Sequence, residues 1–407
     1  MSVPAVPELS FRDFAAELEA KERRIPLHGT IETTFRCNLN CVHCYVSKPF
    51  HSGRTRAREM GLERLLPLLD EIADRGCLDL LLTGGEVLIR RDFPQLYAYA
   101  VRKGFRVTVF TNGTLVTEGI ARLFGAMMPA RVEITLYGMT AATYERITRV
   151  PGSFDRCMRG IMLLQGCGAR LGLKTMLTKW NEHELVEMRT FARNLGIGFR
   201  HDALLNPRVD GLEIPIEELQ LPPERVVAAD LDVPSLRRRQ RESASRLAAA
   251  SGAGACEDRL FLCGAGAVSF NVDPRGGLQL CQLARQPSFD LRTGTFEQGW
   301  NGFLPALRDR CRSKASPCRT CTLLPVCSSC PGASQLEHGD PERPVARFCE
   351  ITHRRVHALL GDFPGHRADA ACCLNPRSVQ DYATPARREV TRAGINPAST
   401  DRCARQT

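Results

Sequence analysis

The sequence predicts an α/β protein built as an open arc of six parallel strands, a partial (β/α)6 barrel, followed by a small cysteine-rich domain. Two observations carry this prediction. Short β-rich runs and amphipathic helical runs alternate between residues 28 and 207, as in a parallel sheet with right-handed crossovers. Of the 18 cysteines, three follow the first β-rich run and twelve lie from residue 256 onward. The chain has 407 residues, which is too long for one ordinary domain.

Changes in composition divide the chain into five expected segments. They are an N-terminal extension (1–27), the partial barrel (28–207), a helical bridge rich in proline, arginine and alanine (208–255), the cysteine-rich domain (256–350), and a C-terminal helix with a disordered tail (351–407).

Each expected strand is a short run of β-branched and other apolar residues. The six runs are 29–34, 78–83, 105–111, 131–137, 171–177 and 198–204. Amphipathic stretches with apolar residues at helical spacing lie between them. These stretches are 61–76, 92–103, 117–128, 155–166 and 182–195. In parallel α/β architectures the ligand binds at the carboxyl ends of the strands, so the residues that follow each strand are the first candidates for a site.

The N-terminal residues and the cysteine content indicate the compartment. Residues 1–24 are charged and lack an apolar core, so they do not form a signal peptide. No run of 18 apolar residues occurs, and we expect no membrane span. A cysteine-rich chain without a secretory signal indicates metal or redox chemistry in a reducing compartment. We therefore expect a cytoplasmic protein.

The net charge of +10 raises the question of an acidic partner. Arginines cluster at 237–241 and 308–314. A nucleic-acid surface is one interpretation, but only 6% of the residues are aromatic and they do not alternate with the basic ones. We expect no nucleic-acid partner. Solvated faces that attract an acidic peptide are the simpler interpretation.

The stretch "TTFRCNLNCVHCYV" places Cys37, Cys41 and Cys44 at the spacing C-x3-C-x2-C on the loop after the first expected strand. Structural zinc requires four ligands in a closed tetrahedron. His43 is a possible fourth ligand, but it lies between two cysteines of a tight loop. An iron–sulfur cluster held by three thiolates leaves one iron open, and an open iron can bind and activate a small molecule.

The triplet followed by the aromatic Tyr45 resembles the signature of the radical S-adenosylmethionine enzymes. The resemblance implies a [4Fe–4S] cluster whose open iron chelates the amino and carboxyl groups of S-adenosylmethionine. One electron then cleaves the sulfonium to give methionine and a 5′-deoxyadenosyl radical, which abstracts hydrogen from the substrate.

The motif "LLLTGGEVLIR" at the end of the second strand is similar to the glycine–glycine–glutamate motif of this family. By that resemblance, Gly84 and Gly85 let the backbone approach the ligand, and Glu86 accepts a hydrogen bond from the α-ammonium group. An ordinary turn at a strand end is the alternative interpretation.

Two later strand ends and one segment that follows them also match the family. Asn112 in "FTNGT" occupies a position that faces the ligand in the family, and Thr135 in "ITLYG" fits the hydroxyl that contacts the ribose or carboxylate. Arg146 in "TYERITRVPGSF" fits the arginine that pairs with the carboxylate. A surface ion pair is the alternative for Arg146.

The second set of cysteines resembles the SPASM extension of these enzymes, which holds two auxiliary [4Fe–4S] clusters. By that pattern, the first auxiliary cluster is held by Cys263, Cys281 and Cys330, with Cys256 as the fourth ligand. The second is held by Cys318, Cys321, Cys327 and Cys349. One departure is the spacing of two residues between Cys327 and Cys330, where the family usually has three. A zinc ribbon requires a longer spacer between its cysteine pairs.

The resemblance implies a maturase that oxidatively modifies, and most simply crosslinks, a ribosomally synthesised peptide. The alternatives are a cofactor-biosynthesis enzyme like the pyrroloquinoline-quinone maturase, a sulfatase-maturing enzyme, and a non-catalytic iron–sulfur or zinc-binding scaffold. Gln282 follows Cys281 where sulfatase maturases have a catalytic aspartate, which disfavours that branch. Asp202, at the end of the sixth strand, is a candidate catalytic residue, although a structural carboxylate fits equally well.

The implied partners are a precursor peptide and a reductant such as flavodoxin or ferredoxin. The residues before the first strand are too few for the leader-binding winged-helix domain that some family members carry. We therefore expect a separate small protein to bind the leader of the precursor.

Overall fold

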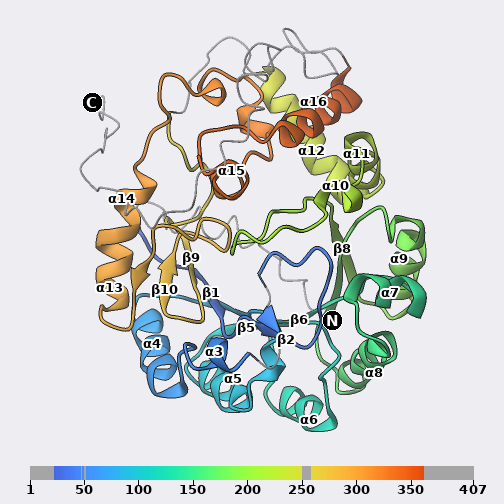
Figure 1. Ribbon diagram of the computed structural model, residues 1–407, viewed down its shortest axis with the longest axis vertical. Helices are drawn as coiled ribbons and strands as arrows, with labels where there is room; N and C mark the ends of the chain where they lie inside the picture. The colour runs from blue at the N-terminus through green and yellow to red at the C-terminus, as the bar shows by residue number, and fades with distance from the viewer. Residues whose placement is uncertain (1–22, 47, 50–51, 250–257, 362–407) are drawn as a thin grey trace, which may run out of the picture.

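The computed structural model describes residues 23–46, 48–49, 52–249 and 258–361, and a nine-stranded sheet forms its centre (Figure 1). The six predicted strands are present as β1 (His28–Glu32), β4 (Asp79–Thr83), β5 (Arg106–Thr111), β6 (Arg131–Thr135), β7 (Leu171–Met176) and β8 (Gly198–Asp202). They lie side by side in this order, and each pair of neighbours is parallel. The predicted open arc of parallel strands is therefore confirmed.

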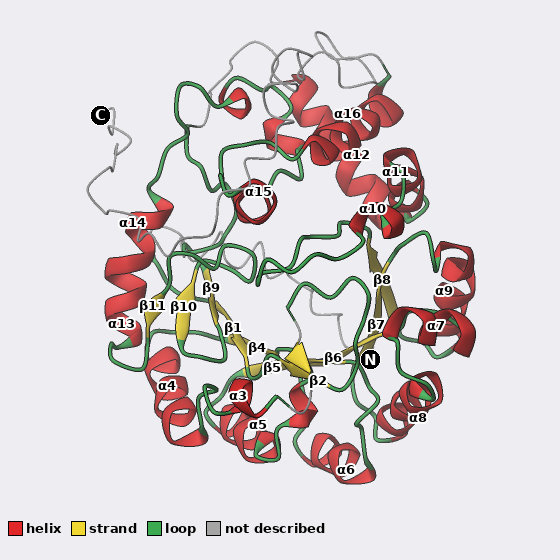
Figure 2. Cartoon of the chain, viewed as in Figure 1, coloured by secondary structure: helices red, strands yellow, loops and turns green. Residues whose placement is uncertain are grey.

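Helices cover the outer, convex face of the arc (Figure 2). The five predicted helices are α4 (Leu62–Asp74), α5 (Phe93–Arg102), α6 (Glu118–Ala126), α8 (Ser153–Gly166) and α9 (Leu185–Asn194). In α4, Leu65, Leu68, Leu69 and Ile72 are buried, which is the spacing of one helix face. The strands alternate in the same sense, since Val107 and Val109 of β5 are fully buried while their neighbours are less so.

A sixth helix of the barrel, α7 (Ala141–Thr148), was not predicted. It begins after Thr140, whose hydroxyl accepts a hydrogen bond from the backbone N–H of Thr143. The carboxylate of Glu184 also accepts hydrogen bonds from both threonine hydroxyls. The start of α7 thus depends on a residue about forty positions later in the chain.

The cysteine-rich segment extends the sheet beyond β1, which the sequence did not predict. β9 (Ser269–Val272) pairs parallel to β1, and β10 (Gly277–Gln279) and β11 (Phe289–Asp290) follow in antiparallel order. The segment continues into α13 (Phe296–Gln298) and α14 (Leu304–Arg308), and α13 contacts α4. Most buried apolar side chains of both segments belong to one hydrophobic core, and Ala333, Val345 and Phe348 form a second, small cluster.

The bridge and the C-terminal segment form a group of helices at one end of the arc (Figure 1). They are α10 (Ile216–Leu219), α11 (Pro223–Leu231), α12 (Pro234–Ala249) and α16 (Ala346–Leu360). The helix α15 (Pro331–His338) belongs to the cysteine-rich segment. Both α11 and α12 pack against α16. The first residues of the expected bridge, 208–215, are not helical, and the expected C-terminal helix begins at Ala346 rather than after residue 350.

Several expectations fall on residues that the structure does not describe: most of the N-terminal extension, Cys256 and the tail after residue 361. Short elements complete the described chain: β2 (Arg36–Cys37) pairs with β3 (Lys48–Pro49), and α3 (Gly53–Arg56) follows. Within the described residues, no helix combines the length and the apolar character needed to cross a bilayer.

Candidate functional site

The three cysteines of the first motif lie on one loop that starts at β2. The backbone N–H of Cys44 donates to the carbonyl of Cys41 at 3.1 Å, which closes a tight turn between them. Burial is the main cause that raises the pKa of Cys37 to about 12, and nearby Glu86 and Cys44 raise it further. Burial and the neighbouring thiols of Cys44 and Cys37 likewise raise the pKa of Cys41. The structure thus brings the three thiols together as the sequence predicts.

Backbone hydrogen bonds from two distant segments hold this loop. The N–H groups of Asn40 and Val42 donate to the carbonyls at the end of α7, each at 3.0 Å. On the other side, the guanidinium group of Arg208 donates to the carbonyl of Cys44 at 2.9 Å, and the N–H of Val209 donates to that of Tyr45 at 2.9 Å. The segment after β8 therefore contacts the cysteine loop, although its sequence shows no motif.

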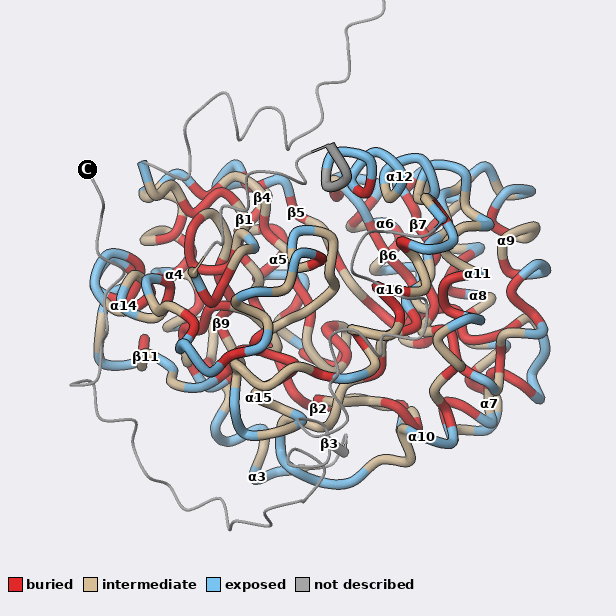
Figure 3. Tube along the Cα trace, turned by 90° about the horizontal axis from the view of Figure 1, so that it is seen from above, coloured by how far each residue is buried: buried red, intermediate tan, exposed pale blue. Residues whose placement is uncertain are grey.

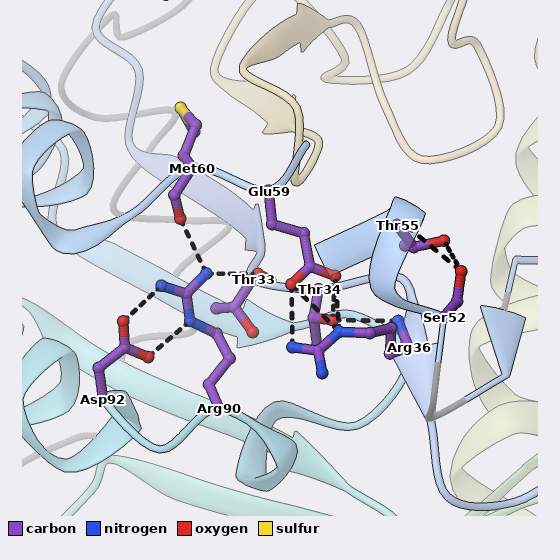
Figure 4. A network of polar contacts seen from close by, with 9 residues as sticks. All are labelled: Thr33, Thr34, Arg36, Ser52, Thr55, Glu59, Met60, Arg90 and Asp92. Atoms are coloured by element: carbon purple, nitrogen blue, oxygen red, sulfur yellow. Dashed lines mark hydrogen bonds and ion pairs between the residues drawn. The ribbon is translucent and has the colours of Figure 1, made fainter. Parts of the chain in front are cut away.

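The chain that leads into Cys37 is fixed by two arginines (Figure 4). Arg36 pairs with Glu59 at 3.0 Å, and the hydroxyl of Thr34 donates to the same carboxylate at 2.5 Å. Arg90 donates to the carbonyls of Thr33 and Met60, each at 2.9 Å. Because these groups are largely buried, the segment before the cysteines is held rigidly.

The glycine pair at the end of β4 packs on this same segment. A Cβ atom on Gly84 would lie 2.3 Å from the carbonyl oxygen of Thr34, and one on Gly85 would lie 2.2 Å from that of Arg36. Gly84 also has a φ of +146°. The N–H of Gly85 donates to the carbonyl of Thr34 at 2.7 Å. The glycines are thus required by the close approach of two backbone segments, whatever ligand lies beside them.

Glu86 is 1% exposed, and its carboxylate connects the ends of β4 and β5. One oxygen accepts hydrogen bonds from the Thr111 hydroxyl at 2.7 Å and from the Leu88 N–H at 3.1 Å. The other accepts from the Asn112 N–H at 2.7 Å. Burial raises the pKa of Glu86, and these hydrogen bonds oppose the rise. The second oxygen keeps room for a further donor.

Asn112 connects Glu86 to the cysteine loop. Its side-chain amide nitrogen lies 3.7 Å from the sulfur of Cys37 and donates to the Asn38 side-chain oxygen at 3.0 Å. Its own oxygen accepts from the N–H of Thr114 at 2.9 Å. Asn112 is therefore held in one orientation against the first cysteine.

The other two sequence candidates lie further along the arc. Thr135 is the last residue of β6, and no protein partner of its hydroxyl occurs in the described chain. Arg146 is exposed on α7, and its guanidinium carbon lies 4.1 Å from the centre of the Trp180 ring. Arg146 lies on the helix that follows β6, and Trp180 lies after β7, so the contact joins the segments that follow these two strands. The structure brings Arg146 to this ring rather than to a carboxylate.

Tyr45 lies between the first cysteine loop and the cysteine-rich segment. Burial raises the pKa of its phenol, and nearby Glu32, Cys44 and Cys281 raise it further. Arg285 opposes the rise and forms a buried bidentate ion pair with Glu32, at 2.7 and 2.8 Å. Removing one partner of such a pair costs about 3–5 kcal/mol. This ion pair fixes the cysteine-rich segment against the end of β1.

The remaining described cysteines of the two motifs form two groups. We call Cys263, Cys281 and Cys330 the proximal thiol group, because Cys281 lies near Tyr45. Burial is the main cause that raises the pKa of Cys281, and Cys330 and Cys263 raise it further. Cys256, the expected fourth member, lies outside the described residues.

We call Cys318, Cys321, Cys327 and Cys349 the distal thiol group. Burial, followed by the neighbouring thiols of Cys327, Cys318 and Cys321, raises the pKa of Cys349 to about 12. The helix α16 carries Cys349, and the other three belong to the turns before α15. The neighbouring thiols in each group are thus ones that the family resemblance assigns to the same cluster.

The donor set of these groups fits iron–sulfur clusters. Backbone N–H groups donate to the sulfurs of Cys37, Cys281 and Cys327 at 3.3–3.4 Å. Hydrogen bonds to sulfur are one of the means by which a protein sets the potential of a cluster. The proposed ligands in each group are cysteine thiols, the ligands that hold [4Fe–4S] clusters.

The side chains of His43 and Asp202 each contact neighbouring residues of the protein. The ring of His43 is buried edge-on against Tyr137 with 5.0 Å between ring centres, and burial lowers the pKa of His43 to about 4. Asp202 is exposed at the end of β8, and its carboxylate accepts a hydrogen bond from the N–H of Leu204 at 2.9 Å. Both side chains therefore have local roles in the structure.

A charged group inside the arc has no counterpart in the sequence motifs. Lys174 pairs in register with Thr135 on the neighbouring strand, and its ammonium group lies 3.0 Å from the centre of the Phe110 ring. Burial lowers the pKa of Lys174 to about 7, although Glu133 opposes this effect. Glu133 also binds Arg200 in a bidentate pair. Lys174 is thus a largely buried amine, in register with a candidate ligand residue, whose charged form is disfavoured by burial.

The chain is similar in sequence to known proteins. Residues 31–192 match the model of the Radical SAM superfamily. The chain is 32% identical over 182 residues to AdoMet-dependent heme synthase of Methanosarcina barkeri (strain Fusaro / DSM 804). The aligned segment covers 45% of this chain and 51% of that protein. The chain thus spans about half the length of the heme synthases that it matches.

Two further similarities extend beyond the barrel. Mycofactocin maturase MftC of Mycobacterium tuberculosis (strain CDC 1551 / Oshkosh) is 29% identical over 340 residues, which is 78% of this chain and 82% of that protein. The crystal structure of Streptococcus suis SuiB bound to precursor peptide SuiA has a TM-score of 0.55 at 14% identity, and the match covers 84% of this chain and 82% of that chain. The second similarity is one of fold.

Proposed function

Because residues 31–192 match the model of the Radical SAM superfamily, we propose that the chain is a radical S-adenosylmethionine maturase that oxidatively modifies a ribosomally synthesised peptide. Bound S-adenosylmethionine and the cluster at Cys37, Cys41 and Cys44 supply a 5′-deoxyadenosyl radical that abstracts hydrogen from the peptide. The product is an oxidised residue, and in the simplest case an intramolecular crosslink.

One observation carries the proposal: thiols from distant parts of the sequence lie near one another in three separate groups. The proximal thiol group approaches the cysteine loop through Tyr45, and the Glu32–Arg285 pair holds the two segments together. The similarity to mycofactocin maturase reaches well beyond the barrel, so it supports a function that needs both segments. A non-catalytic scaffold would need none of the strand-end residues.

The chain's own residues have the following proposed roles. Cys37, Cys41 and Cys44 hold the cluster that binds S-adenosylmethionine. Glu86 accepts a hydrogen bond from the ammonium group of the ligand through its less occupied oxygen, and Thr135 offers it a hydroxyl. Arg146 and Tyr45 complete the ligand site.

The auxiliary clusters are assigned to the other two groups of thiols. The proximal thiol group, with Cys256, holds one of them, and the distal thiol group holds the other. The proposed partners are a precursor peptide, a separate small protein that binds its leader, and flavodoxin or ferredoxin as reductant.

Glu86→Gln is expected to weaken binding of S-adenosylmethionine and to leave the iron content unchanged. The variant loses the charge, and its amide group cannot accept from Thr111, Leu88 and Asn112 while also accepting from the ligand. A charge-assisted hydrogen bond contributes about 1.5–3 kcal/mol, so Kd should rise roughly ten- to hundred-fold. Equilibrium binding to the reconstituted protein measures it.

Asp202→Asn is the matched control, because this exposed carboxylate only accepts a local backbone hydrogen bond. Arg146→Ala should have a smaller effect than Glu86→Gln, since its guanidinium group is exposed over Trp180. An unchanged affinity in the Glu86 variant would mean that the ligand binds elsewhere.

The direct test of the function is mass spectrometry of a candidate precursor peptide after incubation with the reconstituted protein, S-adenosylmethionine and dithionite under anaerobic conditions. We expect 5′-deoxyadenosine together with a peptide that has lost about two hydrogens, since the clusters serve a net oxidation. A peptide left unmodified by an enzyme that cleaves S-adenosylmethionine would point to a non-peptide substrate.

A further inference from the structure

The helix α12 carries an exposed cationic face. Its inward positions are Leu236, Gln240 and Ala244, at the i, i+4, i+8 spacing of one helix side. The exposed positions include all of its arginines (Figure 3). We call Arg237, Arg238, Arg239, Arg241 and Arg246 the arginine face of α12. These five positive charges stand against one negative charge, Glu242, so the helix has a net charge of +4 (five minus one).

These guanidinium groups lack partners in the described chain: none of the five forms an ion pair or hydrogen bond with a described residue. The other arginine run differs. Arg308 and Arg312 are buried and donate to the carbonyls of Ala265 and Leu260. The two runs look alike in the sequence, but only the one on α12 forms a surface. An exposed face of one sign attracts a partner of the opposite sign and speeds association.

The position of α12 indicates which partner fits. The helix contacts η5 (Leu324–Val326), which lies between Cys321 and Cys327, and it packs against α16, which carries Cys349. The helix α12 therefore lies over the two chain segments that supply the distal thiol group, and its arginine face is on the exposed side of the same helix. A charged partner seated on this face would lie next to the redox centre proposed for that group.

We propose that the arginine face of α12 is the docking surface for an acidic one-electron carrier protein that accepts electrons from the centre held by the distal thiol group. This inference rests on the proposed function. Loss of two hydrogens from the peptide sends one hydrogen atom to the deoxyadenosyl group and leaves one electron and one proton. The oxidised carrier takes the electron, and water or a nearby base takes the proton.

An acidic leader segment of the precursor peptide is the alternative partner that the arginine face would attract. The contacts favour the carrier, because α12 packs on the segments of the distal thiol group. Within the described part of the chain, α12 has no comparable contact with the strand ends where a peptide must react. A carrier gains from this position, since electron transfer requires a short distance to the redox centre. A leader gains nothing from lying beside that group.

The test is the affinity of the cluster-loaded protein for an acidic, FMN-loaded oxidised flavodoxin, measured by anisotropy of labelled flavodoxin. Arg238→Glu, Arg239→Glu and Arg241→Glu are combined in one variant. Three reversed charges should raise Kd by at least about tenfold at low ionic strength. The difference should shrink at high salt, where the Debye length falls to about 3 Å. Iron content checks that the variant retains its clusters.

The matched control reverses Arg102, Arg122 and Arg159 to glutamate. These arginines are exposed on α5, α6 and α8, so the net charge changes equally on a distant surface. Flavodoxin affinity should stay at the wild-type value in this control. Any of three results would overturn the proposal. Flavodoxin binds wild type and the α12 variant equally, both variants lose the same amount of flavodoxin affinity, or wild type does not bind flavodoxin.

Two further measurements separate the alternatives. Loss of binding to an acidic leader peptide in the α12 variant, with flavodoxin affinity intact, would assign the face to the peptide and overturn the proposal. Cleavage of S-adenosylmethionine driven by dithionite needs no carrier, so its absence in wild type would refute the proposed function by itself. Its presence, with flavodoxin affinity independent of α12, would refute only the docking surface.

Discussion

Replacing Cys37, Cys41 and Cys44 together by alanine is expected to abolish reductive cleavage of S-adenosylmethionine and to lower the iron content from about twelve to about eight atoms per chain. The three thiols are the ligands proposed for the cluster that binds the ligand, and an alanine side chain offers iron no donor. The proximal and distal thiol groups lie on other segments and should keep their clusters. Iron analysis after anaerobic reconstitution and chromatography of 5′-deoxyadenosine measure both effects.

The triple variant should fold, because backbone groups hold the cysteine loop. Asn40 and Val42 bind the end of α7, and the carbonyl of Cys44 binds Arg208. Cys167→Ala is a suitable control: this thiol lies at the end of α8, donates to the carbonyl of Leu164 and belongs to neither motif. It should change neither the iron content nor the cleavage. Stoichiometric zinc with negligible iron in the wild-type protein would contradict the cluster assignment.

The sequence predicts the barrel well because its signals are local. Each of the six parallel strands is a short apolar run followed by a polar turn, and the helix faces show regular apolar spacing. Parallel strands bring their carboxyl ends to one edge. This rule alone places the end of β4, with Glu86, beside the end of β5, with Asn112, and the structure joins them through a hydrogen bond of 2.7 Å.

Long-range pairings account for most of what the sequence does not predict. β9 consists of four residues and β10 of three, and each becomes a strand only by pairing with the edge beside β1. The Glu32–Arg285 pair joins residues 253 positions apart. No local pattern indicates which of many arginines will be buried against a given glutamate. The same reason explains why the two arginine runs, one buried and one exposed, cannot be distinguished by composition.

The roles of individual site residues are predicted only in part. The glycine pair looks like a ligand-binding turn in the sequence, yet Gly84 and Gly85 are also required by contacts with Thr34 and Arg36. The sequence does not indicate Lys174 as a site residue, because a single lysine in a strand belongs to no motif. Its partner in register is Thr135, and only the sheet alignment places the two side by side.

Replacing Cys318 and Cys321 together by alanine is expected to stop formation of the oxidised peptide far more severely than formation of 5′-deoxyadenosine. Both residues belong to the distal thiol group, whereas the cysteine loop that is proposed to bind S-adenosylmethionine lies on another segment. Hydrogen abstraction should therefore continue. Without an electron acceptor, the substrate radical cannot reach the oxidised product. It is instead reduced by one electron from dithionite and one proton from water, so that 5′-deoxyadenosine accumulates beside an unmodified peptide. The iron content should fall by about four atoms per chain.

Mass spectrometry of the precursor peptide, together with the amount of 5′-deoxyadenosine, gives the ratio that decides this prediction. Wild-type protein should yield a peptide lighter by about two hydrogens, in proportion to 5′-deoxyadenosine, because the protein's part is to position the acceptors and exclude water. The double variant should yield 5′-deoxyadenosine without that product, and Cys167→Ala should behave as wild type. A peptide of unchanged mass with an inverted stereocentre would show epimerisation, and a gain of one methyl group would show methyl transfer. Either result in wild type would remove the oxidative role of the distal thiol group, because neither product has lost the electrons that this group is proposed to carry away.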